Sequence, residues 1–319
     1  MNNYILSCCS AADMPFEFFK QREIYVASFH FCINGKEYTD DFGRSLSYED
    51  FYKEVDNGAL PTTSQINISE FINYFEPFLQ AGHDILHVSL SSGLTGTFNS
   101  ASAAAAELRD MYPERTIIVA DSLCASSGYG LLIDSLYNLK KQGKTIDELV
   151  AFIEYRRLNV NHIFYTTDLT HFHRGGRISA TSCVIGNLLN LCPFMEMDKD
   201  GKLSVCSKVR GKKKAAKESV EKMLRLCDKG IDYNGQCIIS HSGCLDDALY
   251  LAKLIEDTFP NLKGKLEINE IGTVIGSHCG RGTVALFFYG TSRAANFETE
   301  TIKSTCSDAS VCIKNTAVS

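Results

Sequence analysis

Residues 84–109 read DILHVSLSSGLTGTFNSASAAAAELR, and this stretch decides the fold class. It begins with an apolar run that predicts a buried strand over Asp84–Ser89. A serine- and glycine-rich loop follows, and an alanine-rich segment then predicts a helix from about Phe98 to Arg109. The same order recurs at once, because a predicted strand over Thr116–Ala120 precedes a predicted helix near Ala125–Lys140. Strands that alternate with helices are typical of crossover units in a parallel sheet.

The flanking segments extend this pattern to both sides. Branched and aromatic residues predict strands at Tyr4–Ser7 and Ile24–Phe31, helical spacing predicts a helix over Ile68–Leu79, and the polar segment 34–58 is expected to be a loop. A further helix is predicted over Thr145–Arg157, with Thr145 as its cap and Glu148 three residues later. We therefore expect residues 1–160 to form an α/β domain with a parallel sheet.

The second half follows a different pattern, in which Asp200-Gly201 separates two β-like runs as in a hairpin. The predicted elements are strand His162–Thr166, helix Ile178–Leu191, strands Phe194–Met197 and Lys202–Val209, helix Lys213–Cys227, strand Gln236–Ser240, helix Leu245–Phe259, and strands Lys265–Ile271 and Val284–Tyr289. This mixture favours an α+β domain over residues 161–290, with helices on one side of a mixed sheet. Residues 291–319 are rich in Ser and Thr and aperiodic, so we expect a poorly ordered tail.

Composition excludes several classes of protein. A chain that is 45% hydrophobic and 22% charged is ordinary for a folded protein. The net charge of −6 has the wrong sign for a general nucleic-acid coat. The start lacks the features of a signal peptide, and no apolar run is long enough to cross a bilayer. Thirteen irregularly spaced cysteines favour free thiols in a reducing cytoplasm, without disulfides or zinc.

Four polar loops lie where strands are predicted to end, and ligands bind beyond the carboxyl ends of strands in open α/β sheets. The loops are Pro61–Gln65, Ser91–Thr97, His173–Arg177 and Gly276–Gly282. Hydroxyls and backbone N–H groups at a helix start form an anion site, so the loop before the alanine-rich helix can hold a carboxylate or a phosphate. A capped helix start is the plainer interpretation of that loop. His278, between glycines, is interpreted equally well as a ligand contact or as a structural residue.

The segment Lys208–Lys214 carries five positive charges in seven residues. In an acidic chain such a segment can steer an anionic partner such as nucleic acid, an acidic protein surface or a nucleotide-bearing enzyme. A solvated hairpin end is the alternative. Nucleotide-binding signatures and the GxSxG elbow of hydrolases are absent, and a pairing of Ser91 or Ser92 with His278 lacks an orienting Asp. His171 and His173 lack a third metal ligand at a fixed spacing.

Taken in order along the chain, several short motifs make the sequence similar to the DegV family, the fatty-acid-binding proteins that serve bacterial fatty acid kinase. The resemblance runs from about Tyr4 to Tyr289. The motifs are Ser10 with Asp13-Met14-Pro15, Thr62-Thr63-Ser64-Gln65, SSGLTGTFNSA (91–101), Asp121-Ser122, RGGRIS (174–179), Asp200-Gly201-Lys202-Leu203, KVRGKKKA (208–215) and IGSHCGRGTVALFF (275–288).

The resemblance implies two α/β domains with one long-chain fatty acid buried between them. It implies a carrier without a catalytic role or a cofactor, which presents the fatty-acid carboxylate to a separate ATP-dependent kinase that forms an acyl phosphate. The residues implied at the carboxylate are Thr63, Ser92, His278, Thr62 and Arg174, with Arg177 in the same loop as Arg174. The residues implied at the kinase are Arg210, Lys208, Lys212 and Lys213.

Two positions depart from the family pattern. Cys9 stands where the family usually has Asp, and Arg281 stands where Pro is frequent. The hydrogen bonding of the first loop is therefore expected to differ, and Arg281 is expected either to tighten anion binding or to face the partner. Neither nucleic acid nor a membrane is expected as a stable partner. A serine esterase that uses Ser92 and His278, and a nucleic-acid-binding regulator that uses Lys208–Lys214, are the competing hypotheses.

Overall fold

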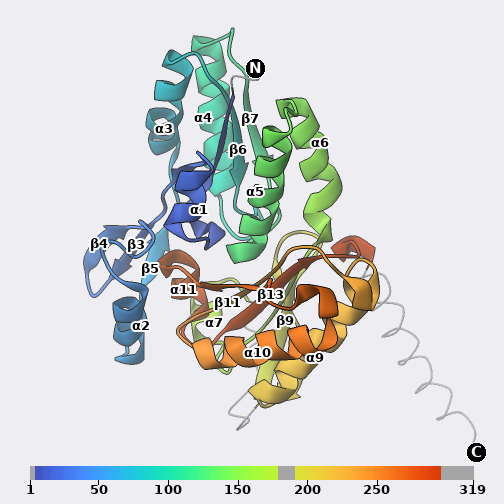
Figure 1. Ribbon diagram of the computed structural model, residues 1–319. Coiled ribbons are helices and arrows are strands. Elements are labelled where there is room, and N and C mark those ends of the chain that lie inside the picture. The colour runs from blue at the N-terminus through green and yellow to red at the C-terminus, as the bar shows by residue number, and fades with distance from the viewer. Residues whose placement is uncertain (1–3, 179–190, 296–319) are drawn as a thin grey trace, which may run out of the picture.

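The computed structural model describes residues 4–178 and 191–295. Two large sheets occupy the two ends of the molecule, and the N-terminal end of helix α5 (Ser126–Lys141) lies between them (Figure 1). Helix α5 belongs to the first part of the chain and contacts strands β8, β11 and β13 of the second. The predicted combination of a parallel-sheet α/β domain and a mixed-sheet domain is confirmed.

The first sheet has the strand order β2-β1-β6-β7, and every neighbouring pair is parallel. Its strands are β1 (Tyr4–Cys9), β2 (Tyr25–Ala27), β6 (Asp84–Ser89) and β7 (Ile117–Asp121). Its helices are α1 (Phe16–Gln21), α3 (Ile68–Gln80), α4 (Thr97–Met111), α5 and α6 (Ile146–Arg156). Helices α3 and α4 lie on one side of the sheet, and α5 and α6 lie on the other (Figure 1). Thr145 caps α6 as predicted, in a reciprocal capping box with Glu148.

The second sheet has the order β10-β9-β8-β13-β11-β12, and only the β11–β12 pair is parallel. Its strands are β8 (Val160–Tyr165), β9 (Leu191–Met197), β10 (Leu203–Arg210), β11 (Cys237–His241), β12 (Glu267–Glu270) and β13 (Val284–Tyr289). Strand alternation gives the sheet two apolar faces. Phe164 and Phe287 face the first part of the chain, whereas Tyr165 and Phe288 face α9 (Lys212–Leu226) and α10 (Leu245–Thr258).

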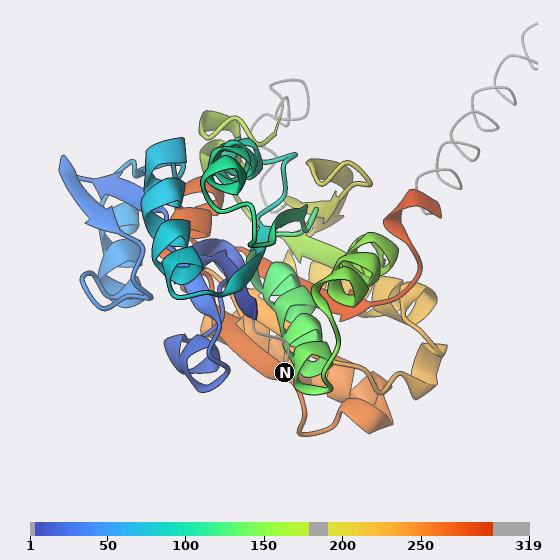
Figure 2. The same ribbon diagram turned by 90° about the horizontal axis from the view of Figure 1, so that it is seen from above.

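The polar segment 34–58 is not the loop that we predicted. It contains strand β4 (Lys36–Thr39) and helix α2 (Tyr48–Asp56), and β4 belongs to a three-stranded sheet with β3 (His30–Ile33) and β5 (Thr62–Ser64). This unit projects to one side of the molecule (Figures 1 and 2). The surface of α2 is polar, but Phe51, Tyr52 and Val55 recur at helical spacing and bury one face. The abundance of polar residues concealed this short amphipathic pattern.

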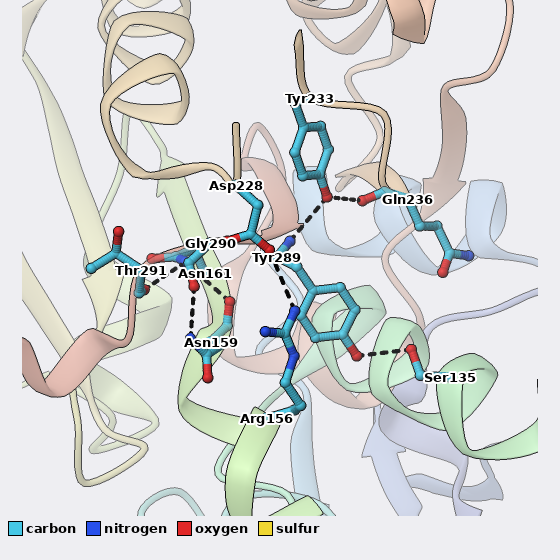
Figure 3. A network of polar contacts seen from close by, with 10 residues as sticks. All are labelled: Ser135, Arg156, Asn159, Asn161, Asp228, Tyr233, Gln236, Tyr289, Gly290 and Thr291. Carbon is cyan, nitrogen blue, oxygen red and sulfur yellow. Dashed lines mark hydrogen bonds and ion pairs between the residues drawn. The ribbon is translucent and has the colours of Figure 1, made fainter. Parts of the chain in front are cut away.

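The chain leaves the second sheet through a network of polar contacts at the end of β13 (Figure 3). Gly290 donates its backbone N–H to Asn159 at 2.9 Å, and the Asn159 side chain donates back to Gly290 at 2.8 Å. The Tyr289 hydroxyl lies 2.9 Å from the Ser135 hydroxyl. Arg293 follows and is buried, with only 2% of its surface exposed. Burial of Arg293 fixes the path of the chain just after β13, and the predicted tail over residues 291–319 stays a prediction.

Two further predictions concern residues that the structure does not describe. The predicted helix Ile178–Leu191 lies almost entirely outside the described residues, as do residues 296–319 of the predicted tail. Within 4–178 and 191–295, no helix combines the length and the apolar character that crossing a bilayer requires. The ten cysteines in these ranges are free thiols.

We predict that Arg293→Ala destabilises the fold by about 2–4 kcal/mol. The buried guanidinium donates to the backbone carbonyls of Leu123 (2.7 Å), Arg157 (3.1 Å) and Asp198, so its removal leaves three loops without their shared donor. Urea unfolding followed by circular dichroism measures the change. Arg225→Ala, at an exposed position on α9, is the control and should leave the midpoint unchanged. Equal midpoints for the two variants would contradict the prediction.

Candidate functional site

A cavity of about 470 Å³ lies between the two sheets and receives side chains from both parts of the chain. Its wall is mainly apolar. The apolar lining residues are Phe29, Leu90, Leu94, Ala125, Phe164, Phe172, Met197, Leu203, Ile271, Val274, Ile275, Cys279, Ala285 and Phe287. This volume is within the range of small-molecule sites, which are concave and apolar with a few placed polar groups.

Polar residues also line the cavity, and they include a contact between Thr63 and His278 as well as the side chains of Ser126, His162 and Thr283. Oγ1 of Thr63 lies 2.8 Å from Nε2 of His278. Thr63 is the middle residue of β5, and His278 lies in the last turn of α11 (Thr273–Cys279). Gln65, Thr95 and Arg177 also line the cavity. The Gln65 carboxamide lies against Gly96, which places the Thr95 loop beside β5.

His278 is neutral at pH 7. Burial is the main cause that lowers the pKa of His278 to about 4, and the positive charges of Arg177 and Arg174 lower it further. Nδ1 of His278 is buried without a hydrogen-bond partner among the described residues. This atom faces Gly175, where a β-carbon would lie only 2.3 Å away. Gly175 is therefore required for the approach of the imidazole, which leaves Nε2 as the nitrogen that can bind Thr63.

The structure brings together only part of the predicted carboxylate site. Thr63 and His278 are in contact, but Thr62 is exposed on the opposite face of β5. Arg174 is also exposed, and it donates to the Pro61 carbonyl at 2.7 Å. Its neighbour in the same loop, Arg177, lines the cavity instead and also donates to the Gly175 carbonyl.

Ser92 is not among the residues that line the cavity. Its side chain is exposed, and its backbone N–H donates to Asp121 at 3.1 Å. The preceding hydroxyl of Ser91 is buried and donates to the Gly201 carbonyl at 2.8 Å, so it secures the β9–β10 turn. The hydroxyl of this loop that lines the cavity is Thr95. Thr95 lies two residues before α4, and its hydroxyl is 2.9 Å from the hydroxyl of Thr97, the first residue of the helix. A hydroxyl near a helix start is suited to an anion, and this was the signal in the sequence.

His278 was predicted in a glycine-rich loop and lies in a helix instead. Helix α11 takes up residues 276–279 of the predicted loop Gly276–Gly282 and begins three residues before it. Gly276 lies inside this helix, and the position requires glycine because a β-carbon there would lie only 2.7 Å from the Tyr52 hydroxyl. Similarly, part of the predicted loop at residue 173 is the short helix α7 (Thr170–Arg174). Within the described ranges, no group of three or more His, Cys, Asp or Glu side chains forms a metal site, so His171 and His173 have no such partners.

The predicted partner residues form a basic segment on one side of the cavity. Lys208 and Arg210 are exposed at the end of β10, and Lys213 is exposed and lies over the Tyr250 ring. Lys212 pairs with Asp247 at 2.6 Å. The ammonium group of Lys212 lies near Gly282, so the basic segment is adjacent to the loop that follows α11.

The two departures from the family pattern are structural in this fold. The backbone N–H of Cys9 donates to the Tyr129 hydroxyl at 2.9 Å, and its thiol is buried. Arg281 pairs with Asp56 of α2 and donates to the Gly243 carbonyl at 3.0 Å. Arg281 is not among the residues that line the cavity. It therefore connects α2 to the second part of the chain.

These features define a class of protein. It is a two-domain α/β protein with a mainly apolar cavity between its domains, lined also by hydroxyls, imidazoles and a guanidinium. A family model described as "Uncharacterised protein, DegV family" matches residues 9–291. A DegV domain-containing protein of Clostridium perfringens is 37% identical over 297 residues, which cover 92% of this chain and 99% of the relative. The chain belongs to the DegV family.

Solved structures share this fold. A DegV family protein from Thermus thermophilus, described as fatty-acid-binding, is 27% identical with a TM-score of 0.79, over 90% of this chain and 99% of that one. The Fatty Acid Kinase (Fak) B3 protein of Streptococcus pneumoniae, solved loaded with linoleic acid, is 19% identical with a TM-score of 0.76, over 90% and 99% of the two chains.

We predict that His278 titrates with a midpoint near pH 4 and that Arg177→Met raises this midpoint. Removing the positive charge removes a repulsion that disfavours the imidazolium ion, and burial still keeps the midpoint below the ordinary value. Nuclear magnetic resonance of labelled histidine measures both values. Arg225→Met, which removes an exposed charge on α9, serves as the control. A midpoint near 6.5 in the unmodified protein would show that the imidazole is solvated and the prediction is wrong.

Proposed function

We propose that this protein binds one long-chain fatty acid in the cavity and presents its carboxylate to a separate ATP-dependent fatty acid kinase, which forms the acyl phosphate. The observation that carries the proposal is a mainly apolar cavity whose lining includes the hydrogen-bonded pair Thr63 and His278. The fatty-acid-binding relative from Thermus thermophilus supports the ligand class. We place the reaction in the cytoplasm, where ATP is available.

The apolar wall suits the tail of such a ligand. Burying about fifteen CH₂ groups at about 0.8 kcal/mol each supplies roughly 10 kcal/mol of gross transfer free energy. Part of this is offset by the freedom that the ligand loses on binding. The tail therefore provides most of the affinity, and the head group has only to avoid being left buried without hydrogen-bond partners.

The polar wall suits the carboxylate. If the neutral His278 carries its proton on Nε2, it donates to Oγ1 of Thr63 and leaves the Thr63 hydroxyl proton for the ligand. Thr95 supplies a second hydroxyl, and Arg177 supplies the positive charge that a buried carboxylate needs. We therefore assign Thr63, Thr95 and Arg177 to the carboxylate and His278 to the orientation of Thr63. Thr95 replaces Ser92 in this assignment.

The esterase hypothesis is less compatible with this geometry. An acyl-transfer site needs a nucleophile within hydrogen-bond reach of its base. Ser92 is exposed and outside the cavity, and the neighbour of His278 is Thr63. A histidine whose pKa is about 4 is also a weak general base at neutral pH.

The basic segment suits the protein partner. Lys208, Arg210 and Lys213 are exposed, and Lys212 lies beside the loop that follows α11. A kinase docked there through an acidic surface would be close to the polar wall of the cavity. Charges of this kind change association rates and partner choice more than the affinity for a buried ligand.

We predict that Thr63→Val and Thr95→Val each weaken fatty-acid binding by about ten- to a hundredfold, because each removes a hydrogen bond to a charged group. Native mass spectrometry and calorimetry with oleic acid measure the loss. Ser92→Ala is the matched control and should bind like the unmodified protein. If Ser92→Ala loses affinity and Thr95→Val does not, the head-group assignment is wrong. If the unmodified protein takes up no C14–C18 acid, the proposed function is wrong.

A separate prediction concerns the partner. Arg210→Glu and Lys213→Glu should lower the rate of acyl-phosphate formation by a fatty acid kinase while oleic acid binding stays unchanged. The reversed charges repel the acidic surface that we assign to the partner. Lys229→Glu, on the turn after α9, is a control of equal charge that should leave the rate unchanged. A charge reversal at Arg210 that leaves the rate intact would place the docking surface elsewhere.

A further inference from the structure

Helix α11 forms one side of the cavity but is held by residues from the other part of the chain. The residues of α11 and its approach that line the cavity are Ile271, Val274, Ile275, His278 and Cys279. The helix belongs to the connection between β12 and β13. Its first contacts are with two buried carboxylates of the N-terminal part. Gly272 N–H donates to Oδ1 of Asp13 at 3.0 Å, and Thr273 Oγ1 donates to Oδ1 of Asp40 at 3.0 Å.

The fit at this end of the helix leaves no space for a side chain. A β-carbon on Gly272 would lie 2.8 Å from Oδ1 of Asp13. The φ of Gly272 is −69°, which any residue can adopt, so this glycine is required by the contact and not by the backbone. Tyr52 of α2 adds a further bond, because its hydroxyl donates to the Ile271 carbonyl at 2.7 Å.

The other end of α11 carries His278, which bonds Thr63 of β5. The N-terminal part of the chain therefore holds both ends of the helix. Movement of α11 away from these contacts would take away a wall of the cavity together with the hydrogen-bond partner of Thr63. Such a movement would widen the way by which a ligand enters and leaves the cavity.

We propose that the contacts of Asp13 and Asp40 with Gly272 and Thr273 form a latch, which holds α11 against the ligand and whose opening speeds the exchange of a fatty acid. This inference rests on the proposed function for the identity of the ligand. The latch controls the rate of exchange, whereas the head-group residues control the affinity of the closed state.

The latch responds to pH in a defined direction. Burial raises the pKa of Asp13 to about 8, despite the hydrogen bonds from Ser126 (2.5 Å) and Gly272 that oppose this shift. In an open, hydrated state the pKa of Asp13 returns toward its ordinary value of about 4. The closed state therefore binds a proton that the open state releases between about pH 4 and 8. Closure is favoured at low pH and weakens as the pH rises toward 8, by up to about tenfold per pH unit.

Other titratable groups surround Asp13. They are Asp40, Tyr48, Tyr52, Glu270 and Cys279, and Arg281 lies near Glu270. Burial raises the pKa of each of the five, that of Cys279 to about 12. The two tyrosines and the cysteine therefore remain neutral between pH 6 and 9. Asp40 and Glu270 can share the response, so the test must isolate Asp13.

The test measures release of oleic acid from loaded protein into excess serum albumin between pH 6 and 9. The unmodified protein should release faster by up to about tenfold per pH unit, with a plateau above about pH 8. Asp13→Asn keeps an acceptor for Gly272 without the charge, so its release should be slow and nearly independent of pH. Gly272→Ala should release faster at every pH. Asp134→Asn, a buried carboxylate paired with Arg22, is the control and should follow the unmodified protein.

The outcomes separate the latch from the ligand. If Asp13→Asn keeps the pH profile of the unmodified protein, or Gly272→Ala releases at the unmodified rate, the latch proposal is wrong while fatty-acid binding stands. If no variant takes up oleic acid, the proposed function fails. Hydrogen–deuterium exchange of α11 in the ligand-free protein then tests the latch alone. Its protection, corrected for intrinsic rates, should fall with pH in the unmodified protein and not in Asp13→Asn, and an identical fall in both would overturn the latch.

Discussion

The hydrogen bond between Thr63 and His278 joins the two parts of the chain in the polar wall of the cavity. Thr63 is placed by the small sheet β4-β3-β5, and His278 is placed by the helix between β12 and β13. Neither residue reaches the cavity unless the two parts dock in this geometry. The apolar wall depends on the same docking, since Phe29 and Leu90 come from the first part and Phe164 and Phe287 from the second. The cavity and its polar wall therefore form together.

In the polar wall, Arg177 is charged and His278 is neutral. Burial together with two arginines keeps His278 neutral, so the imidazole serves as a hydrogen-bonding group and not as a cation. Arg177 carries the positive charge at the cavity wall, and its partial burial lowers the pKa of the guanidinium. A half-buried guanidinium without a carboxylate partner loses hydration without full compensation. A ligand carboxylate offsets that cost, which makes an anionic head group the natural complement of this wall.

Long periodic segments were predicted well from the sequence. Helices α3, α4, α5, α6, α9 and α10 and most strands of the two large sheets lie close to their predicted positions, because apolar repeats mark them. The prediction of one strand over Ile24–Phe31 was wrong, because this segment is divided between β2 of the first large sheet and β3 of the small sheet. The unit from β3 to β5 was missed because its apolar residues are few and spread over short elements. Of the residues predicted at the carboxylate, Thr63 and His278 line the cavity and Ser92 does not. The sequence could not distinguish the hydroxyls of this loop, because their directions depend on the backbone geometry.

The error at α11 has a specific physical cause. Glycine was interpreted as a signal of a loop, but Gly272 and Gly276 are four residues apart and lie on one side of a helical turn. A β-carbon at Gly272 would meet Asp13, and one at Gly276 would meet Tyr52. Because neither glycine has a side chain, the backbone of this segment can pack directly against side chains of the N-terminal part of the chain. Close approach lets a carboxylate bond the Gly272 N–H directly, and it places His278 at the far end of the same rigid element. These glycines therefore fix the position of α11 in the site, whereas the sequence alone suggested a flexible loop.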